Sequence, residues 1–206
     1  MKKINTYINE KLKLNRDTAG KQYNYRPKDN NELKRLLKKL LEERGPDADL
    51  NDIDVRDVTS MWELFKYLDP HNIDISEWDV SNVDSMEGMF MYCKNFNSDL
   101  SRWNVGRVTN MDGVFYGCEK FDCDLSKWDV SNVHSMDEMF GWCKNFNSDL
   151  SKWNVSNVIH TFGMFNGCEK FDCDLSGWNV SKLKNMTGMF DKCDSLKKFP
   201  DWYKNE

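Results

Sequence analysis

Histidine is scarce in this sequence, and familiar catalytic motifs are missing. The 206 residues include only His71, His134 and His160, and their spacing gives no regular position that could supply a catalytic base. Phosphate-binding loops, dinucleotide-binding motifs, zinc-protease motifs and nucleophile elbows do not occur. These absences predict a protein that is not an enzyme and that uses no cofactor.

Long apolar runs are missing as well. No segment approaches the ~18 consecutive apolar residues of a membrane-spanning helix. The chain begins with two lysines, as a signal peptide can, but Asn5, Asn9 and Glu10 interrupt the place where an apolar core of ~7–15 residues belongs. The sequence therefore predicts no membrane span and a cytoplasmic or virion-associated location. Transport to the cell surface by a non-standard route is the alternative.

A 25-residue repeat organises most of the chain. Tryptophan recurs at this interval from Trp78 to Trp178, and phenylalanine keeps the same step from Phe65 to Phe190. A fixed period in the twenties is typical of solenoid proteins. The sequence predicts six rungs, near residues 50–74, 75–99, 100–124, 125–149, 150–174 and 175–199.

The apolar spacing within one rung predicts a strand followed by a helix. Leu100, Trp103 and Val105 form the inward set of a short strand, with outward residues between them. Later apolar residues, such as Met111 and Phe115, are spaced for a turn or two of helix on the opposite side. The expected fold is a leucine-rich-repeat-like solenoid, with short parallel strands on one side and short helices or turns on the other.

Both ends of the chain are expected to cover or extend this stack. Asp29, Glu32 and Gly45 mark the start and the end of a helix whose leucine stripe would cap the first rung. Phe199-Pro-Asp-Trp-Tyr203 would cover the last rung. A shorter amphipathic docking helix is predicted nearer the N-terminus, with the apolar face Ile4, Tyr7, Ile8 and Leu12. The predicted division is 1–28 for the amphipathic helix and linker, 29–49 for the capping helix, 50–199 for the six-rung solenoid and 200–206 for the C-terminal cap.

Charge is unevenly shared along the chain. Residues 1–44 carry 13 Lys and Arg against 6 Asp and Glu, whereas the remaining residues carry 16 against 28. A charged outer face is ordinary for a surface helix, so a capping role is favoured over binding of nucleic acid or membrane by the basic helix. The acidic body also disfavours nucleic acid as a partner.

Several repeated columns are expected to serve the core. Five cysteines, Cys93, Cys118, Cys143, Cys168 and Cys193, share one repeat position, close enough for disulfides, but a regular inward column fits free thiols better. The tryptophans are expected to pack inside rather than form a carbohydrate-stacking platform. Thr161 stands where other rungs have methionine. Either Phe162 rotates inward to fill that gap or the fifth rung is looser.

An aspartate ladder precedes each Leu-Ser pair. Its members are Asp74, Asp99, Asp124, Asp149 and Asp174. Each carboxylate is expected to accept hydrogen bonds from loop amides. Calcium between the rungs is the alternative, but it requires about six to eight oxygen ligands and usually a glycine-bearing loop, and no glycine recurs at these turns.

Two columns of outward residues flank the tryptophans and are the predicted partner-binding surface. They begin at Asp52 and Asp54 in the first rung. The first column continues with Glu77, Arg102, Lys127 and Lys152, and the second with Asp79, Asn104, Asp129, Asn154 and Asn179. The first column changes from acidic to basic, which suits an extended polypeptide of complementary charge. Free variation of an unconstrained surface is the alternative.

The repeated Met/Val-Phe-x-x-Cys and Asp-Leu-Ser-x-Trp-Asp/Asn-Val elements resemble those of the BspA-like leucine-rich repeat family, across residues 50–199. Members occur among bacterial surface proteins, mycoplasma lipoproteins and some phage genomes. The resemblance implies a leucine-rich-repeat-type solenoid that acts in adhesion or protein interaction, with no catalytic residues. The expected function is a non-enzymatic interaction or scaffolding module whose partner is another protein. The alternative is a surface or virion-associated adhesin that binds host protein or carbohydrate, with or without calcium.

Overall fold

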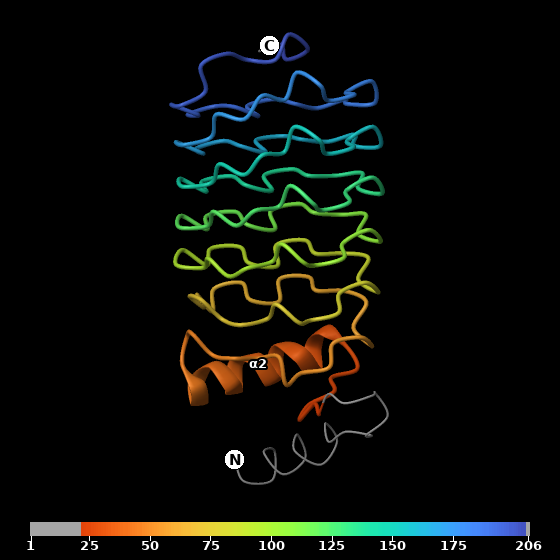
Figure 1. Cartoon of the computed structure of the whole chain (residues 1–206), viewed down its shortest axis with the longest axis vertical. Helices are drawn as coiled ribbons and strands as arrows, with labels where there is room; N and C mark the ends of the chain where they lie inside the picture. Colours follow the sequence, from red (N-terminus) through yellow and green to blue (C-terminus); the bar gives the residue numbers. More distant parts are fainter. Residues whose placement is uncertain (1–21, 205–206) are drawn as a thin grey trace.

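The chain coils upward in a stack of rungs, which the computed structural model describes for residues 22–204 (Figure 1). Helix α2 (Asn30–Arg44) lies at the base of the described stack, and the C-terminal segment lies at the opposite end (Figure 1). Parallel bridges join equivalent residues of successive rungs, from Ser60 through Asn110 to Asn185, and so fix the 25-residue register. Ile4, Tyr7, Ile8 and Leu12, the predicted docking helix, lie outside the described residues.

The predicted leucine-rich-repeat-like fold is wrong. Throughout residues 22–204 the only helix is α2, and the only β-type pairings are isolated bridges, so this part of the chain contains no sheet. The rungs consist of reverse turns. The short parallel strands expected on one side and the short helices considered for the other are both missing from the described rungs.

Left-handed backbone prevents the predicted helical turns. In the third rung Gly113 and Gly117 have φ angles of +58° and +75°, and equivalent residues of the other rungs share this conformation. A residue with positive φ cannot continue a right-handed helix. Backbone amides therefore alternate between partners: the Cys118 N–H donates to Phe115 O within the rung at 2.9 Å, and the Phe115 N–H donates to Met139 O of the next rung at 2.9 Å.

The predicted strand segment forms two reverse turns instead. The Trp103 N–H donates to Leu100 O at 3.1 Å, and the Val108 N–H donates to Val105 O at 2.9 Å. Asp99 precedes the first turn, and its carboxylate accepts the backbone N–H two residues later at 2.9 Å. Aspartate and asparagine favour such local bonds over a strand ladder. The apolar side chains still point inward, because a turn places residues three apart on the same side.

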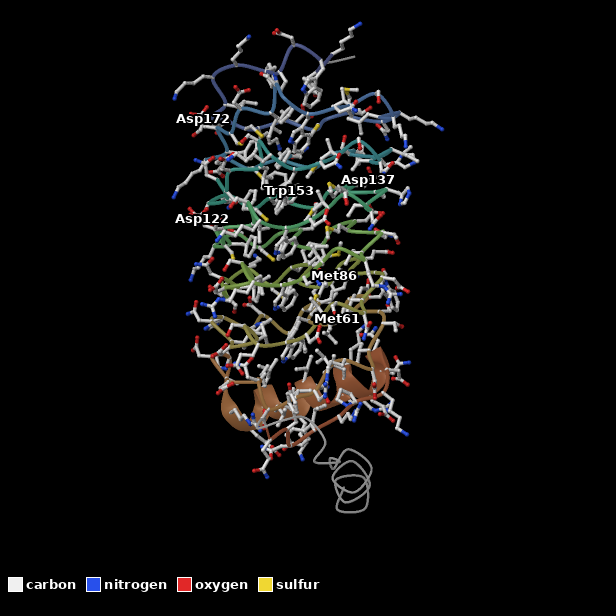
Figure 2. The ribbon with its side chains drawn as sticks, turned by 45° about the vertical axis from the view of Figure 1, so that its right-hand side comes forward. Met61, Met86, Asp122, Asp137, Trp153 and Asp172 are labelled. Atoms are coloured by element: carbon white, nitrogen blue, oxygen red, sulfur yellow. The ribbon has the colours of Figure 1, made fainter. Side chains whose placement is uncertain are left out.

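The core consists of columns of like side chains inside the stack. The five tryptophans of the 25-residue series, Trp78, Trp103, Trp128, Trp153 and Trp178, are only 4–5% exposed, and Figure 2 shows Trp153 between the two sides of the stack. The Trp103 indole N–H donates to Ile75 O of the preceding rung at 3.1 Å, which satisfies its polar atom. The prediction that these tryptophans are core residues is therefore confirmed.

All seven cysteines are free thiols, as predicted. In the inward column, each thiol donates to a carbonyl of the preceding rung, for example Cys118 Sγ to Phe90 O at 3.1 Å. Burial raises the pKa of the Cys93 thiol to about 12 and that of Cys123 to about 11. These thiols are therefore protonated at neutral pH and act as small packing groups.

The proposed inward rotation of Phe162 is wrong. Phe162 is 42% exposed, whereas Thr161 is 1% exposed and occupies the methionine position itself. The Thr161 hydroxyl donates to Asn185 O at 3.2 Å, so its polar atom is satisfied inside the stack. The hydrogen bond allows the shorter side chain to be buried without help from its neighbour.

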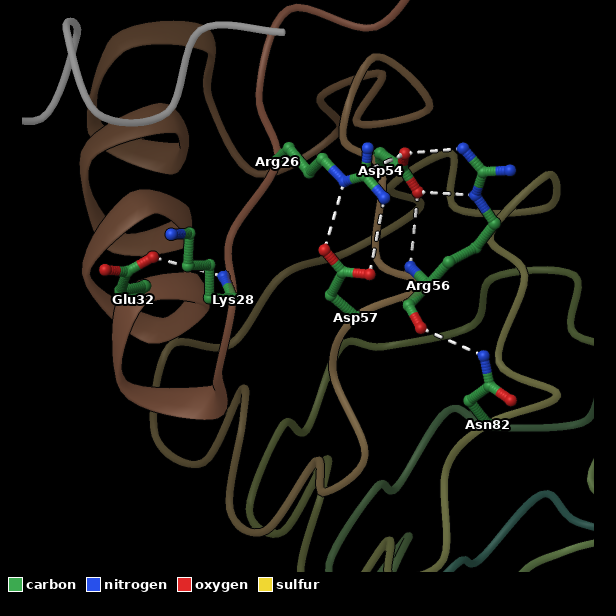
Figure 3. Close-up of polar contacts among 7 residues, drawn as sticks. All are labelled: Arg26, Lys28, Glu32, Asp54, Arg56, Asp57 and Asn82. Atoms are coloured by element: carbon green, nitrogen blue, oxygen red, sulfur yellow. Dashed lines mark hydrogen bonds and ion pairs between the residues drawn. The ribbon is translucent and has the colours of Figure 1, made fainter. Parts of the chain in front are cut away.

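The predicted signals for α2 are confirmed. The Asp29 carboxylate accepts the Glu32 N–H at 2.8 Å. The Glu32 carboxylate accepts the Lys28 N–H at 3.1 Å, as Figure 3 shows. Gly45, with φ +88°, ends the helix. The buried stripe that faces the first rung comprises Leu33, Leu36, Leu37 and Leu40.

Aromatic residues cover the other end of the stack. Trp202 stacks on Trp178 with ring centroids 6.2 Å apart, and Tyr203 meets the edge of Phe190 at 4.9 Å. Phe199 remains 50% exposed. The predicted C-terminal cover is therefore provided mainly by Trp202 and Tyr203, and the exact division of the chain into four segments stays a prediction.

A cluster of ion pairs fixes the segment before α2 to the first rung (Figure 3). Asp54 is 1% exposed and pairs with Arg56 at 2.7 Å, while Arg26 lies 3.7 Å from Asp54 and 3.1 Å from Asp57. Burial alone would raise the pKa of the Asp54 carboxyl, but hydrogen bonds and charge from Arg56, together with Arg26, outweigh it and hold this pKa below its usual range.

Asp54→Asn should therefore destabilise the protein by about 2 kcal/mol at pH 7, because it leaves Arg56 without its buried partner. A depressed carboxyl pKa stabilises the fold above the unfolded value of ~4, and this stabilisation disappears as the pH falls through the folded value. Urea unfolding at pH 7 and in acid should show a difference from wild type that shrinks in acid. Asp57→Asn, at an exposed position, is the control, and equal stability of wild type and Asp54→Asn at pH 7 would contradict the prediction.

Candidate interaction surface

The predicted binding columns lie on the surface beside the buried tryptophans. All nine residues proposed from the second rung onward are exposed. They are Glu77, Arg102, Lys127, Lys152, Asp79, Asn104, Asp129, Asn154 and Asn179. Because the rungs keep a 25-residue register, equivalent positions follow one another along the stack. Their role in binding a partner stays a prediction.

The first rung does not take part in these columns. Asp52 accepts two hydrogen bonds from Arg44 of α2, each at 2.9 Å. Asp54 is buried in the ion-pair cluster and does not point outward, so its assignment to the second column is wrong. Both carboxylates instead attach the capping region to the stack.

The second column also has a local structural role. Asp129 Oδ1 accepts the Ser131 N–H at 3.0 Å, and Asn104 Oδ1 accepts the Gly106 N–H at 3.2 Å. Hydrogen bonds from Ser131 lower the pKa of the Asp129 carboxyl. One side-chain oxygen at each of these positions is thus used to form a turn.

The three cations of the first column are available for a partner. Arg102, Lys127 and Lys152 form no side-chain hydrogen bond or ion pair with any other residue in the range 22–204. They do lie near the aspartate ladder. Hydrogen bonds from Ser101, assisted by the charge of Arg102, lower the pKa of Asp99.

The aspartate ladder is formed as expected. Each carboxylate accepts the backbone N–H of the serine two residues later, at distances between 2.9 and 3.1 Å. Among the residues that the structure describes, no group of three or more His, Cys, Asp or Glu side chains is arranged to hold a metal ion. The ladder is therefore explained by turn formation.

A row of ion pairs joins the side chains of three successive rungs on another part of the surface. Glu119 pairs with Lys94 at 3.5 Å and with Lys144 at 2.9 Å, and these three side chains border a shallow depression. Lys144, followed by Lys94, lowers the pKa of Glu119. Because these charges already satisfy one another, this surface offers less to a partner than unpaired cations do.

A second exposed surface was missed by the sequence analysis. We call it the aromatic edge, and it comprises Tyr67, Tyr92, Tyr116 and Trp142. The Tyr67 and Tyr92 rings stack with centroids 5.2 Å apart, and Tyr116 meets Tyr92 edge-on at 5.3 Å. Tyr67, Tyr92 and Trp142 are 68%, 39% and 36% exposed. These are large apolar rings at the surface, unlike the repeated tryptophans of the core.

Glycines make room for the aromatic edge. A Cβ added at Gly141 would lie 2.8 Å from the Tyr116 ring, and one added at Gly167 would lie 2.9 Å from the Trp142 ring. Each ring therefore lies over a glycine of the next rung. The sequence signal was the exchange of aromatic residues for glycine at two neighbouring repeat positions, Tyr116 with Gly141 and Tyr92 with Gly117, which an emphasis on invariant columns overlooks.

Acidic residues lie beside the aromatic edge. The Asp137 N–H donates to Asp112 Oδ1 at 2.8 Å, which places these two carboxylates in successive rungs. Burial, followed by the charges of Asp137 and Asp112, raises the pKa of the Glu138 carboxyl. The same glutamate contributes, after burial, to a raised pKa of the Tyr116 hydroxyl. Carboxylates and aromatic rings therefore share one surface.

Stacked, register-locked rungs with exposed columns define a repeat protein that presents extended surfaces. The chain belongs to the family described as "Mycoplasma protein of unknown function, DUF285", which matches residues 33–141 and again residues 100–203. No curated protein and no solved structure matches the chain. Across residues 22–204, no helix has the length and apolar character needed to cross a bilayer.

Proposed function

We propose that this chain is a non-enzymatic protein-binding or scaffolding module, of the kind that the BspA-like sequence resemblance implies. The observation that carries the proposal is the column of exposed cations formed by Arg102, Lys127 and Lys152, one in each of three successive rungs. Cations without ion-pair partners, repeated in register, suit an extended acidic segment of another protein. The acidic balance of the body disfavours nucleic acid as this partner.

Reversing these three charges should abolish capture of the partner. The variant Arg102→Glu/Lys127→Glu/Lys152→Glu is expected to recover at least about tenfold less partner than wild type from a lysate of the producing organism, measured by quantitative mass spectrometry. The fold should persist, because all three side chains are exposed. Unchanged melting by circular dichroism would confirm this.

The matched control is Lys120→Glu/Lys170→Glu/Lys184→Glu, which makes the same change in net charge at exposed positions outside the columns. This control should capture the partner as wild type does. Equal recovery by wild type and by the column variant would sink the proposal. Equal losses in both variants would also contradict it, because they would indicate a general charge effect.

A surface or virion-associated adhesin that binds host protein or carbohydrate is the second candidate. Exposed rings such as Tyr67 and Trp142 favour it, since aromatic side chains provide apolar contact area with a polar tip. Calcium assistance has no support from the described residues, which contain no suitable ligand group.

A further inference from the structure

The aromatic edge lies on one lateral side of the stack, away from the exposed carboxylate of Asp122 and the Asp172 carboxylate two rungs further on. Figure 2 shows Asp137, its acidic neighbour, on the opposite lateral side of the stack from Asp122 and Asp172. The edge is built from positions that vary between rungs, whereas the core columns repeat. The side chains of the aromatic edge are therefore not needed to form the repeated core.

Backbone strain accompanies the side chains of this edge. Tyr67, Tyr92 and Trp142 have φ angles of +63°, +62° and +61°, Lys192 has +57° at the same repeat position, and glycine occupies it at Gly117 and Gly167. A left-handed residue with a side chain is strained, and glycine avoids this strain. Aromatic residues at strained, exposed positions do not serve the backbone, so their role is expected at the surface.

Aromatic rings on this side already contact ammonium groups. Lys192 Nζ lies 4.6 Å from the centroid of the Trp142 ring, and Lys66 Nζ lies 5.4 Å from that of Tyr67. Both distances are within the ~6 Å of a cation–π contact. The protein's own ammonium groups thus show that a cation fits against these rings, and a partner's cation at Trp142 competes with Lys192.

The carboxylates of Asp137 and Glu138 supply negative charge that complements a bound cation. Neither Asp137 nor Glu138 forms an ion pair with lysine or arginine anywhere in residues 22–204. Burial raises the pKa of the Asp137 carboxyl, and the charge of Asp112 adds to this, while the hydrogen bond that Asp137 Oδ1 accepts from the Phe162 N–H at 2.7 Å and the charge of His160 act in the opposite direction. An incoming cation would relieve the repulsion between these carboxylates.

We propose that the aromatic edge binds a lysine- or arginine-rich extended segment of a partner protein. Its cationic side chains lie against Tyr116 and Trp142 and pair with Asp137 and Glu138. Combined aromatic and carboxylate contacts recognise a cation better than either contact alone. This site prefers a basic segment, whereas the column of Arg102, Lys127 and Lys152 prefers an acidic one. The two surfaces therefore differ in the charge of the segment that each attracts.

The test uses a fluorescein-labelled peptide of alternating lysine and serine, titrated with the full chain and followed by fluorescence anisotropy. Trp142→Gly and Asp137→Asn/Glu138→Gln should each weaken binding by about tenfold. Trp142→Gly should remain folded, because glycine occupies the equivalent position in two other rungs and relieves the positive φ. Binding should also weaken as salt is added.

Two control variants distinguish binding at the aromatic edge from a general effect of net charge. Glu169→Gln/Asp194→Asn removes two exposed carboxylates elsewhere and should bind the peptide as wild type does. The column variant Arg102→Glu/Lys127→Glu/Lys152→Glu should retain peptide binding, so failure of one proposal does not imply failure of the other. Equal affinity for a glutamate–serine peptide, unchanged binding by Trp142→Gly, or binding of a chito-oligosaccharide in place of the lysine peptide would overturn the inference.

Discussion

Phe115→Ala should lower the free energy of unfolding by about 3–5 kcal/mol, because it empties the centre of the stack. Phe115 is fully buried, with ring centroids of Phe90 and Phe140 each 5.7 Å away and that of Phe121 4.0 Å away. Hydrogen bonds between rungs hold the neighbouring backbones in register, so the core cannot readily collapse into the cavity. Urea unfolding followed by tryptophan fluorescence measures the loss.

Phe162→Ala is the matched control for this prediction. The same side chain is removed, but Phe162 is 42% exposed, so the free energy of unfolding should change by no more than about 0.5 kcal/mol. Similar losses at Phe115 and Phe162 would contradict the assignment of inward and outward positions. A loss only at Phe162 would show that the fifth rung depends on the side chain that the structure places outside.

The repeat period predicted the arrangement of columns but not the secondary structure. Spacing alone correctly placed residues such as Trp103 and Cys118 inside, because any coil of fixed length returns equivalent side chains to the same side. A spacing of three, as between Phe115 and Cys118, fits a single reverse turn as well as it fits a helix. The left-handed backbone at Tyr92 and Gly117 allows the turn and excludes the helix. The positive φ is hard to predict from the sequence, because glycine stands at this repeat position in one rung and tyrosine in another.

The candidate surfaces were predictable to different degrees. Exposure of Arg102 and Asn104 follows from their positions on either side of an inward tryptophan. The turn-forming hydrogen bond of Asn104 follows less directly, because it depends on a reverse turn that the strand prediction excluded. Contact between Tyr92 and Tyr116 could not be read from the repeat, since these residues occupy different positions in their rungs.

Leu37→Asp, at the base of the stack, should lower the free energy of unfolding by as much as Phe115→Ala does at the centre. Leu37 of α2 is fully buried against the first rung. Removing the leucine alone costs about 2–5 kcal/mol, and an unpaired carboxylate in this apolar contact adds to the loss. Each rung is hydrogen-bonded to its neighbours. Loss of the helical cap should therefore open the first rung before the other rungs, because the first rung then has a neighbour on one side only.

Hydrogen exchange distinguishes this local opening from general destabilisation. In Leu37→Asp, the Met61 amide, which donates to Ser85 O at 2.9 Å, should lose protection before the Phe165 amide, which donates to Met189 O at 2.9 Å. Lys38→Asp, on the exposed side of the same helix, should leave both amides protected. Equal loss at the two amides would mean that the stack unfolds as one cooperative unit, and unchanged protection at Met61 would mean that α2 does not stabilise the first rung.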